Sequence, residues 1–227
     1  MNIDFWHERW EKGETGFHLS KVNPLLVRWW SALTPQPNEP VWVPLCGKSL
    51  DMIWLRQQGH PVSGVELSKQ ALEAFASEQQ LDLRWRTLEK NQPQAQESLT
   101  VAEGEGFELF CGDYFSITAA QLTHIRLIYD RAALVALPTA MRQRYVERMR
   151  ATLPSDWRML LLTFDYPQEQ RPGPPFSVSD DEVRQLFSGC TVEILNEQQE
   201  IDRHGTFRAQ GLTSIIERVY LISDGNA

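Results

Sequence analysis

The stretch that most constrains the fold of this chain is residues 41–68, VWVPLCGKSLDMIWLRQQGHPVSGVELS. Its apolar run 41–43 has the length of a buried strand and ends at Pro44. A tight turn follows, and then Ser49, which can cap a helix that ends at a glycine. A second apolar run, 62–67, completes the pattern. Strand, turn, helix and strand in this order predict a βαβ unit.

A βαβ unit places its first turn where open parallel sheets bind ligands, beyond the carboxyl ends of the strands. Glu66 stands near the end of the second run, about twenty residues after Leu45, and a carboxylate at that interval can accept hydrogen bonds from a ribose diol. The unit therefore suits a nucleoside-containing ligand, either NAD or S-adenosylmethionine. Taken by itself, the stretch also fits an ordinary βαβ unit in which Glu66 is merely solvated.

The glycines of the turn separate these ligands. Gly47-Lys48-Ser49 looks like the end of a phosphate-binding P-loop, but Trp42 stands where that motif needs its first glycine. A dinucleotide-binding turn has three glycines so that the pyrophosphate can approach the backbone, and here Gly47 stands alone. The turn therefore favours a ligand without a pyrophosphate, which is S-adenosylmethionine.

The segment PLCGKSLDMIWLRQQGHPVSGVELS resembles the cofactor loop of the thiopurine S-methyltransferase family of bacterial type. Other pieces resemble this family in the same order: WHERWEKGETGFH, FCGDYF, IYDRAALVAL, PGPPFSV and IDRHG. Several ordered pieces spread over the whole chain are far more specific than one motif. The family belongs to the class I S-adenosylmethionine-dependent methyltransferases.

The resemblance implies an α/β fold, the Rossmann-like fold of class I methyltransferases. We expect a single methyltransferase domain over residues 1–227, with an N-terminal helical lid and cap at 1–33 and a core at 41–222. The core should hold a mainly parallel sheet of the seven-stranded type with helices on both faces. Residues 191–195 and 212–222 alternate well enough to form a C-terminal antiparallel hairpin.

The hydrophobic pattern predicts further elements along the chain. Helices are expected at 3–12, 24–33, 69–79, 138–152 and 180–187, and strands at 107–111, 125–129 and 157–164. Segments 83–88 and 98–102 fit either a hairpin beside the sheet or a solvated loop.

Local residues sharpen these assignments. Ser68 and Ser179 are expected helix N-caps, the latter in a capping box with Glu182. Asp130 and Arg131 should follow a core strand, where active-site side chains gather in this architecture. The proline-rich loop that begins after the strand at 157–164 is a candidate wall of the site.

The resemblance also implies the residues of the site. By the resemblance, the residues that contact the cofactor are Trp6, Trp10, Leu45, Gly47, Glu66, Gly112, Asp113 and Arg131. The substrate side is carried over to Phe17, Arg131 and Arg203. Each of these roles has an alternative: the aromatic residues could pack in the core, Asp113 could serve as a turn residue, and the arginines could be surface charges. Cys46 is expected to be structural.

The implied reaction is methylation of the sulfur of a small aromatic or heterocyclic thiol, similar to a thiopurine. S-adenosylmethionine provides the methyl group in a direct in-line displacement, and the protein mainly supplies alignment and a dry site. The alternatives are methylation of selenium or tellurium compounds, an NAD-binding oxidoreductase, and a non-catalytic methyltransferase-like module.

Composition excludes several other classes of protein. The net charge of −8, with both signs interspersed, argues against nonspecific binding of nucleic acid. No apolar stretch approaches the ~20 residues of a membrane span, and the N-terminus lacks the apolar region of a signal peptide. The three cysteines are far apart, as in reduced cytosolic proteins, and the histidines lack the paired spacing of a metal site. We therefore expect a cytoplasmic monomer that acts on a small molecule without a metal ion.

Overall fold

Strands and helices alternate through much of the chain, as the hydrophobic runs predicted. The computed structural model describes residues 3–13, 18–88, 99–200, 208–209 and 211–225. Its α-helices are α1 (Ile3–Glu11), α2 (Pro24–Trp29), α3 (Leu50–Gln57), α4 (Lys69–Glu78), α5 (Ala119–Leu122), α6 (Thr139–Thr152) and α7 (Asp180–Leu186). Its 3-10 helices are η1 (Trp30–Leu33), η2 (Tyr114–Ser116), η3 (Leu134–Ala136) and η4 (Gln168–Gln170). Its strands are β1 (Val41–Pro44), β2 (Val62–Glu66), β3 (Arg84–Thr87), β4 (Thr100–Gly104), β5 (Phe107–Cys111), β6 (Leu127–Arg131), β7 (Arg158–Asp165), β8 (Thr191–Gln199) and β9 (Ile216–Ser223).

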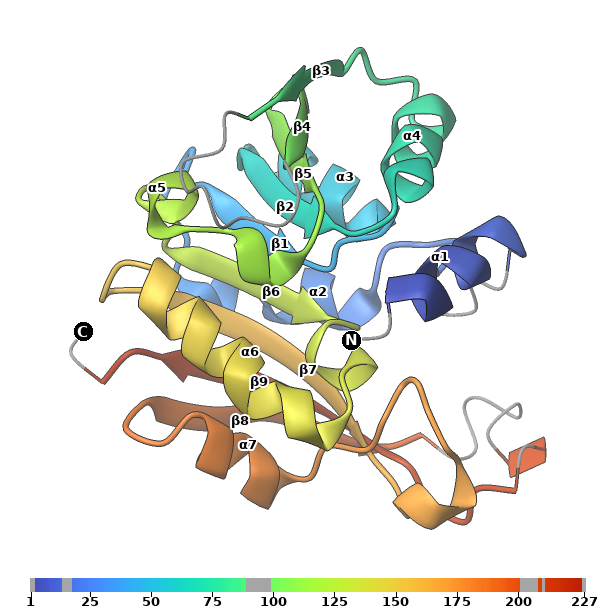
Figure 1. Cartoon of the computed structure of the whole chain (residues 1–227). Coiled ribbons are helices and arrows are strands. Elements are labelled where there is room, and N and C mark those ends of the chain that lie inside the picture. Colours follow the sequence, from blue (N-terminus) through green and yellow to red (C-terminus); the bar gives the residue numbers. More distant parts are fainter. Residues whose placement is uncertain (1–2, 14–17, 89–98, 201–207, 210, 226–227) are drawn as a thin grey trace.

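Within the described residues, the strands form one nine-stranded sheet in the order β3-β4-β5-β2-β1-β6-β7-β9-β8 (Figure 1). The five strands from β5 to β7 are parallel, and β9 and β8 close that side as an antiparallel pair. The mainly parallel, seven-stranded arrangement with a C-terminal hairpin is therefore confirmed. Antiparallel pairing of β3 with β4 and of β4 with β5 adds two strands, so the hairpin prediction holds and the solvated loop is wrong.

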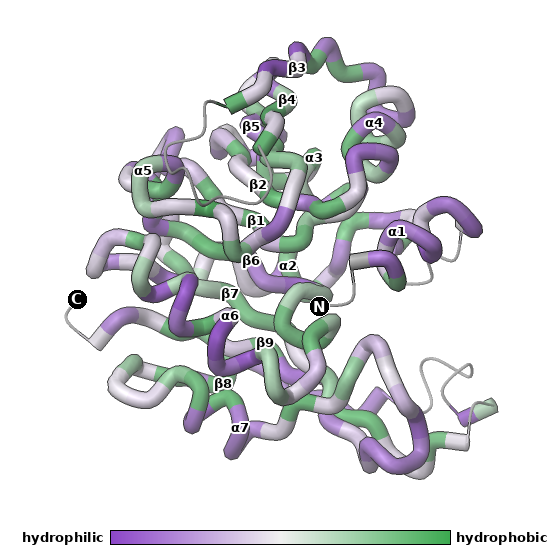
Figure 2. Tube along the Cα trace, viewed as in Figure 1, coloured by the Kyte–Doolittle hydropathy of each residue, from purple (hydrophilic) through white to green (hydrophobic). Residues whose placement is uncertain are grey.

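Alternation along the central strands supplies a hydrophobic layer on each face of the sheet. Trp42 and Ile128 point to the face that packs against α5, α6 and α7. Val43 and Tyr129 point to the opposite face, which packs against α2, α3 and α4. Figure 1 shows α6 and α7 in front of the sheet, and Figure 2 shows hydrophobic central strands beside a largely hydrophilic α6. The covered faces leave the strand ends as the place for a site.

The predicted helix caps hold in three cases. Ser49, Ser68 and Ser179 each accept a hydrogen bond from a backbone amide in the first turn of the following helix. The capping box at Ser179 is wrong, however, because the Glu182 carboxylate accepts two hydrogen bonds from Arg142, at 2.7 and 2.6 Å. A buried guanidinium is a stronger partner for that carboxylate than a backbone amide.

Several predicted boundaries shift for tertiary reasons. The strand expected at 125–129 is β6, which pairs with β7 as far as Arg131, so Asp130 and Arg131 end the strand instead of following it. The helix expected at 24–33 is α-helical only to Trp29 and continues as η1. The strand expected at 212–222 begins at Ile216, where pairing with β7 and β8 starts. None of the described helices has both the length and the apolar surface that spanning a membrane requires.

Candidate active site

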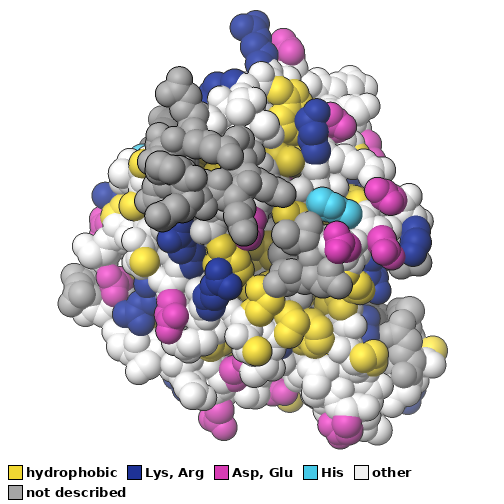
Figure 3. All heavy atoms as spheres, viewed as in Figure 1, with side chains coloured by type: hydrophobic (Ala, Val, Ile, Leu, Met, Phe, Trp, Pro, Cys, Tyr) yellow, Lys and Arg dark blue, Asp and Glu magenta, His cyan; other side chains and the backbone are white. Residues whose placement is uncertain are grey.

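A cavity of about 760 Å³ lies at the carboxyl ends of the central parallel strands. The ends of β1, β2, β6 and β7 contribute to its wall, and so do α1, the segment before α2, the proline-rich loop after β7, and the ends of β8 and β9. Figure 3 shows hydrophobic side chains gathered on the lower middle part of this face, between α1 and α7. The location is the one that open parallel sheets use for ligands.

The turn after β1 forms one wall of the cavity. Leu45 and Gly47 both adopt left-handed backbone conformations, with φ of 48° and 53°. The Cys46 amide donates to the Val65 carbonyl at 3.0 Å, which ties the turn to β2. A Cβ added to Gly47 would lie 3.3 Å from the Trp10 ring, closer than such atoms normally approach. Glycine therefore serves two purposes here, the left-handed turn and the close approach of α1.

Glu66 lies at the end of β2 with its carboxylate fixed at the cavity wall. One oxygen accepts from the Gly47 amide and the other from the Ser68 amide, both at 2.9 Å. Burial raises the pKa of this carboxyl, and the surrounding backbone amides oppose that rise. A carboxylate has about four acceptor positions, so each oxygen keeps capacity for a further donor such as a hydroxyl.

Cys46 lies in the same turn, buried against β2. Its sulfur would be 3.0 Å from a Cβ placed on Gly64. Burial raises the pKa of the thiol well above its ordinary value, and the nearby Glu66 carboxylate raises it further. A thiol held protonated in this way is a poor nucleophile, which agrees with the structural role expected for it.

Gly112 and Asp113 lie beside the site and are not among the described residues that line the cavity. The Gly112 amide donates to the Glu66 carbonyl at 2.9 Å, so the turn after β5 is joined to the end of β2. Asp113 Oδ1 accepts from the Phe115 amide at 3.0 Å and caps η2. Asp113 thus has a turn role through Oδ1, and the cofactor contacts expected of Gly112 and Asp113 stay predictions.

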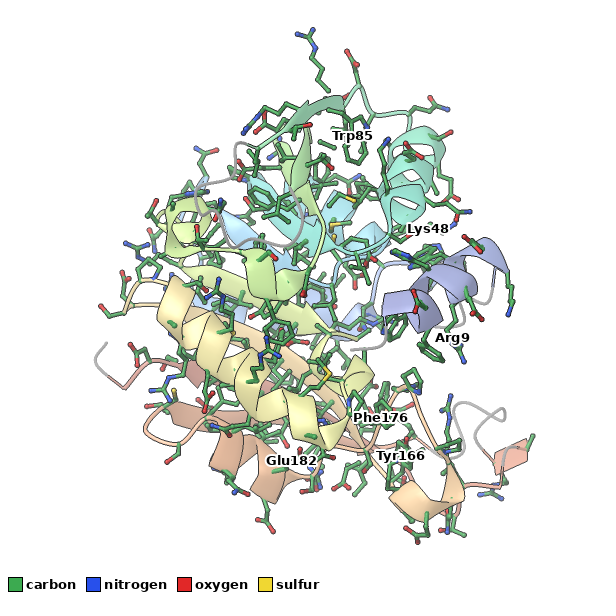
Figure 4. All side chains as sticks on the ribbon, viewed as in Figure 1. Arg9, Lys48, Trp85, Tyr166, Phe176 and Glu182 are labelled. Atoms are coloured by element: carbon green, nitrogen blue, oxygen red, sulfur yellow. The ribbon has the colours of Figure 1, made fainter. Side chains whose placement is uncertain are left out.

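Helix α1 places Trp6, Arg9 and Trp10 on the cavity. Spacings of three and four residues bring these side chains to one side of the helix. The Arg9 guanidinium carbon lies 4.8 Å from the centre of the Phe5 ring. Figure 4 shows Arg9 below α1, on the side of the loop that carries Phe176. Arg9 was missed in the sequence, although it shares the helical spacing of the two tryptophans.

The proline-rich loop after β7 lines the cavity with Pro174 and Pro175, and the peptide bonds before both are cis. The Tyr166 hydroxyl donates to the Pro175 carbonyl at 2.5 Å, and the Phe176 amide donates to the Val135 carbonyl at 2.7 Å. The first bond ties Pro175 to the residue that follows β7, and the second joins the loop to η3. As expected, the loop is a wall of the site.

Charged side chains of both signs face the cavity. Arg131 lines it from the end of β6, and among the described residues no ion pair with Arg131 is found. Arg171 lines it from the loop, and Glu200 and Glu217 line it from the C-terminal hairpin. Glu200 is only 1% exposed. The two acids were missed in the sequence because the strand register decides which way a side chain points.

The structure thus brings together six of the predicted site residues: Trp6, Trp10, Leu45, Gly47, Glu66 and Arg131. Phe17 and Arg203 lie outside the described residues, so their substrate-side roles stay predictions. His18, which the sequence did not single out, also lines the cavity.

Comparison with solved structures defines the class of fold. One similar structure is the Burkholderia thailandensis 1,6-didemethyltoxoflavin-N1-methyltransferase, solved with 1,6-didemethyltoxoflavin and S-adenosylhomocysteine. The alignment covers 98% of this chain and 87% of the Burkholderia chain, with a TM-score of 0.62 and 14% sequence identity. A SAM-dependent methyltransferase from Anabaena variabilis matches 98% of this chain and 94% of its own, with a TM-score of 0.62 and 17% identity. At such identities the likeness concerns the fold, which is that of class I S-adenosylmethionine-dependent methyltransferases.

Sequence comparison defines the family. The model of the family described as Thiopurine S-methyltransferase (TPMT) matches residues 1–225. A thiopurine S-methyltransferase of Pseudomonas fluorescens strain Pf-5 is 44% identical over 230 residues, covering 100% of this chain and 99% of its own length. That of strain Pf0-1 is 46% identical over 225 residues, covering 98% and 99%. That of Aliivibrio fischeri strain MJ11 is 42% identical over 224 residues, covering 99% and 100%. The chain belongs to the thiopurine S-methyltransferase family, which confirms the resemblance and the prediction of an enzyme of this type.

Proposed function

We propose that this chain binds S-adenosylmethionine in the cavity and transfers its methyl group to the sulfur of a small aromatic or heterocyclic thiol. The observation that carries the proposal is the Glu66 carboxylate, held at the cavity wall by the Gly47 and Ser68 amides beside a one-glycine turn. Family membership supports both the cofactor and the class of acceptor.

The residues present fit the cofactor. Glu66 has acceptor capacity left for the two ribose hydroxyls, and Gly47 adds no side chain of its own to the turn. Trp10 covers this turn from α1 and can enclose a ligand that lies against it. A single-glycine turn has no place for a pyrophosphate, which counts against NAD.

S-adenosylmethionine supplies an electrophilic methyl group on a sulfonium, which is already a good leaving group. The work left to the protein is to hold the acceptor in line, exclude water and favour the nucleophilic form of the sulfur. Apolar residues of the wall, among them Leu45, Val135 and Leu162, exclude water. The Arg131 guanidinium favours a thiolate over a thiol because an opposite charge stabilises the ionised form.

We place the acceptor on the side of the cavity formed by Pro174, Pro175 and the C-terminal hairpin, away from Glu66. A flat heterocycle fits against the two proline rings. Arg203 and Phe17 belong to this proposal as further contacts of the acceptor. A selenium or tellurium compound remains an alternative acceptor for the same cavity and mechanism.

We extend the proposal to the organisation of the protein. One domain would comprise residues 1–227, with residues 1–33 as a lid and cap, and the protein would be a cytoplasmic monomer. The three cysteines, Cys46, Cys111 and Cys190, are free thiols, as reducing compartments favour. The mixed, acidic surface charge supports a monomer.

Two measurements test the function. Calorimetric titration with S-adenosylhomocysteine should show one site per chain, whereas tight NAD binding without a response to this product would favour an oxidoreductase. A labelled-cofactor assay should then compare a mercaptopurine, a thiophenol, an aliphatic thiol, selenite, a catechol and a small peptide. Labelling of the mercaptopurine and the thiophenol supports the proposal. Labelling of the catechol or the peptide alone would contradict it, and binding without any turnover would favour a non-catalytic module.

A further inference from the structure

His18 lines the cavity from the segment between α1 and α2, and it is partly buried there. Four charged side chains act on its imidazole: Lys48, Glu78, Arg131 and Asp51. They come from the turn after β1, from the C-terminal end of α4, from the end of β6 and from the first turn of α3. Figure 4 shows Lys48 between α4 and α1. His18 therefore lines the same cavity as the turn that we assign to the cofactor and as Arg131, which we assign to the acceptor.

The two acids near His18 already have partners. The Glu78 carboxylate accepts from the Lys48 ammonium at 2.5 Å. The Asp51 carboxylate accepts from the Asn23 amide at 2.7 Å and from the Tyr129 hydroxyl at 2.9 Å. Neither acid is hydrogen-bonded to His18, and among the described residues no hydrogen bond to the imidazole is found. No side chain or backbone group of the described part of the chain therefore competes with a ligand for the ring nitrogens.

Burial and the two nearby cations favour the neutral imidazole. Burial is the largest cause of a lowered His18 pKa, Lys48 is the next and Arg131 also contributes, while Glu78 and Asp51 oppose the change. The other charged side chains that line the cavity are Arg9, Glu66, Arg171, Glu200 and Glu217. At neutral pH this imidazole carries an unprotonated nitrogen that can accept a proton.

The proposed reaction needs such a group whenever the acceptor enters the cavity as a protonated thiol. A thiol of ordinary acidity, with a pKa near 8.5, is mostly protonated at pH 7, whereas the nucleophile is the thiolate. Arg131 lowers the energy of the thiolate but cannot accept a proton, because a guanidinium is already fully protonated. Given the proposed S-methylation, we propose that His18 is the general base that removes the proton from the acceptor thiol, with Arg131 stabilising the sulfur as it becomes negative.

The S–H bond of the acceptor breaks and its proton forms an N–H bond with the free nitrogen of His18. The electron pair left on sulfur forms the new bond to the methyl carbon, while the bond from that carbon to the sulfonium breaks and its electron pair stays on the departing thioether. The His18 imidazolium then returns its proton to solvent. The products are the methylated acceptor, S-adenosylhomocysteine and one proton.

The test compares two acceptors that differ in their need for a base. Phenylmethanethiol stays protonated near neutral pH, whereas 4-nitrothiophenol is already ionised. His18→Gln keeps a hydrogen-bonding side chain but cannot take up the proton. We expect this substitution to lower kcat for phenylmethanethiol by about 10²- to 10⁴-fold, the contribution typical of a general base, with little effect on 4-nitrothiophenol. Added imidazole or a higher pH should restore part of the lost rate.

The control is His124→Gln, since His124 is exposed and is not among the residues that line the cavity. It should leave both rates unchanged. Calorimetry with S-adenosylhomocysteine should give equal affinities for wild type and His18→Gln, which shows that the site is still formed. An equal loss with both acceptors would overturn the base assignment and make His18 a binding residue. An unchanged rate with phenylmethanethiol would overturn it as well. Absence of turnover with both thiols in the wild-type protein would instead contradict the proposed function itself.

Discussion

The Glu66 carboxylate and the Gly47 amide form a hydrogen bond of 2.9 Å between residues nineteen positions apart in the sequence. The bond joins the end of β2 to the turn after β1, the two pieces that we assign to the cofactor. The Gly112 amide adds the turn after β5 through the Glu66 carbonyl. Three neighbouring strand ends are thus held in one fixed arrangement before a ligand arrives, which reduces the ordering cost of binding.

Replacing Glu66 by glutamine should weaken the binding of S-adenosylhomocysteine by about 10- to 100-fold, because a charged acceptor of two hydroxyls is lost. The NH₂ group of the glutamine would also face the Gly47 or the Ser68 amide, and two donors cannot form a hydrogen bond. The free energy of unfolding should therefore fall by about 1–3 kcal/mol. Calorimetric titration and thermal unfolding measure these effects separately. Glu73→Gln, on the exposed side of α4, is the matched control. Unchanged affinity in Glu66→Gln would place the ribose elsewhere.

The sequence predicted Glu66 and the one-glycine turn because both belong to one local βαβ unit. The caps at Ser49 and Ser68 were predictable for the same reason, since a cap depends only on the residues of one helix turn. Glu200 and Glu217 were not predictable, because their direction depends on the pairing of β7, β8 and β9. The charge pattern also could not reveal that Arg142 is fully buried, since that depends on the docking of α7 onto α6.

The N-terminal segment should act as a lid. Trp10 packs against Gly47, so a ligand seated on the turn would also contact α1. We expect hydrogen exchange of the α1 amides to slow when S-adenosylhomocysteine binds, while exchange in β1 stays as slow as before. Trp10→Ala should remove most of this added protection. Equal exchange in α1 with and without ligand would count against a lid.

Asp130 should make stability depend on pH. Burial raises the pKa of its carboxyl to about 6. Hydrogen bonds from the Tyr145 hydroxyl and the Leu134 amide favour the ionised form and only partly oppose this rise. The folded protein then holds a proton that the unfolded chain has already lost, so stability should fall as pH rises from about 4 to about 6, by up to about 3 kcal/mol. Asp130→Asn should remove this part of the slope, and Asp181→Asn, at an exposed position of α7, should not. Denaturant unfolding at several pH values measures this dependence. If the free energy of unfolding changes with pH equally in Asp130→Asn and in the wild type, the assignment is wrong.

The ion pair between Arg142 and Glu182 should stabilise the docking of α7 on α6. The Arg142 side chain is fully buried and that of Glu182 is 22% exposed. Glu182→Gln leaves the guanidinium without its counter-charge and should cost about 2–4 kcal/mol, somewhat less than a fully buried pair would cost. Arg184→Gln breaks the exposed pair with Asp180 on the same helix and should have little effect. Similar unfolding midpoints for the two variants would contradict this ranking.

Glu200 and Glu217, which line the cavity from the C-terminal hairpin, should select the acceptor by charge. Glu217 lies opposite Phe164 of β7 and opposite Gln198 of β8, and Glu200 lies two residues beyond Gln198, so both carboxylates belong to the same face of the sheet. Both line the cavity, on the side that we assign to the acceptor. A carboxylate in this position should disfavour acceptors that carry a negative group away from the sulfur.

Glu217→Gln should therefore raise kcat/KM for 4-mercaptobenzoate relative to thiophenol by about fivefold or more, since removal of one like charge several ångströms away is worth on the order of 1 kcal/mol. Glu193→Gln, at an exposed position of β8 in the same hairpin, provides the control for a general change in surface charge. The ratio of the two acceptors is the decisive quantity, because a loss of stability would lower both rates together. An unchanged ratio in Glu217→Gln would move the acceptor away from the hairpin and toward α1, where Arg9 would be the next charged residue to test.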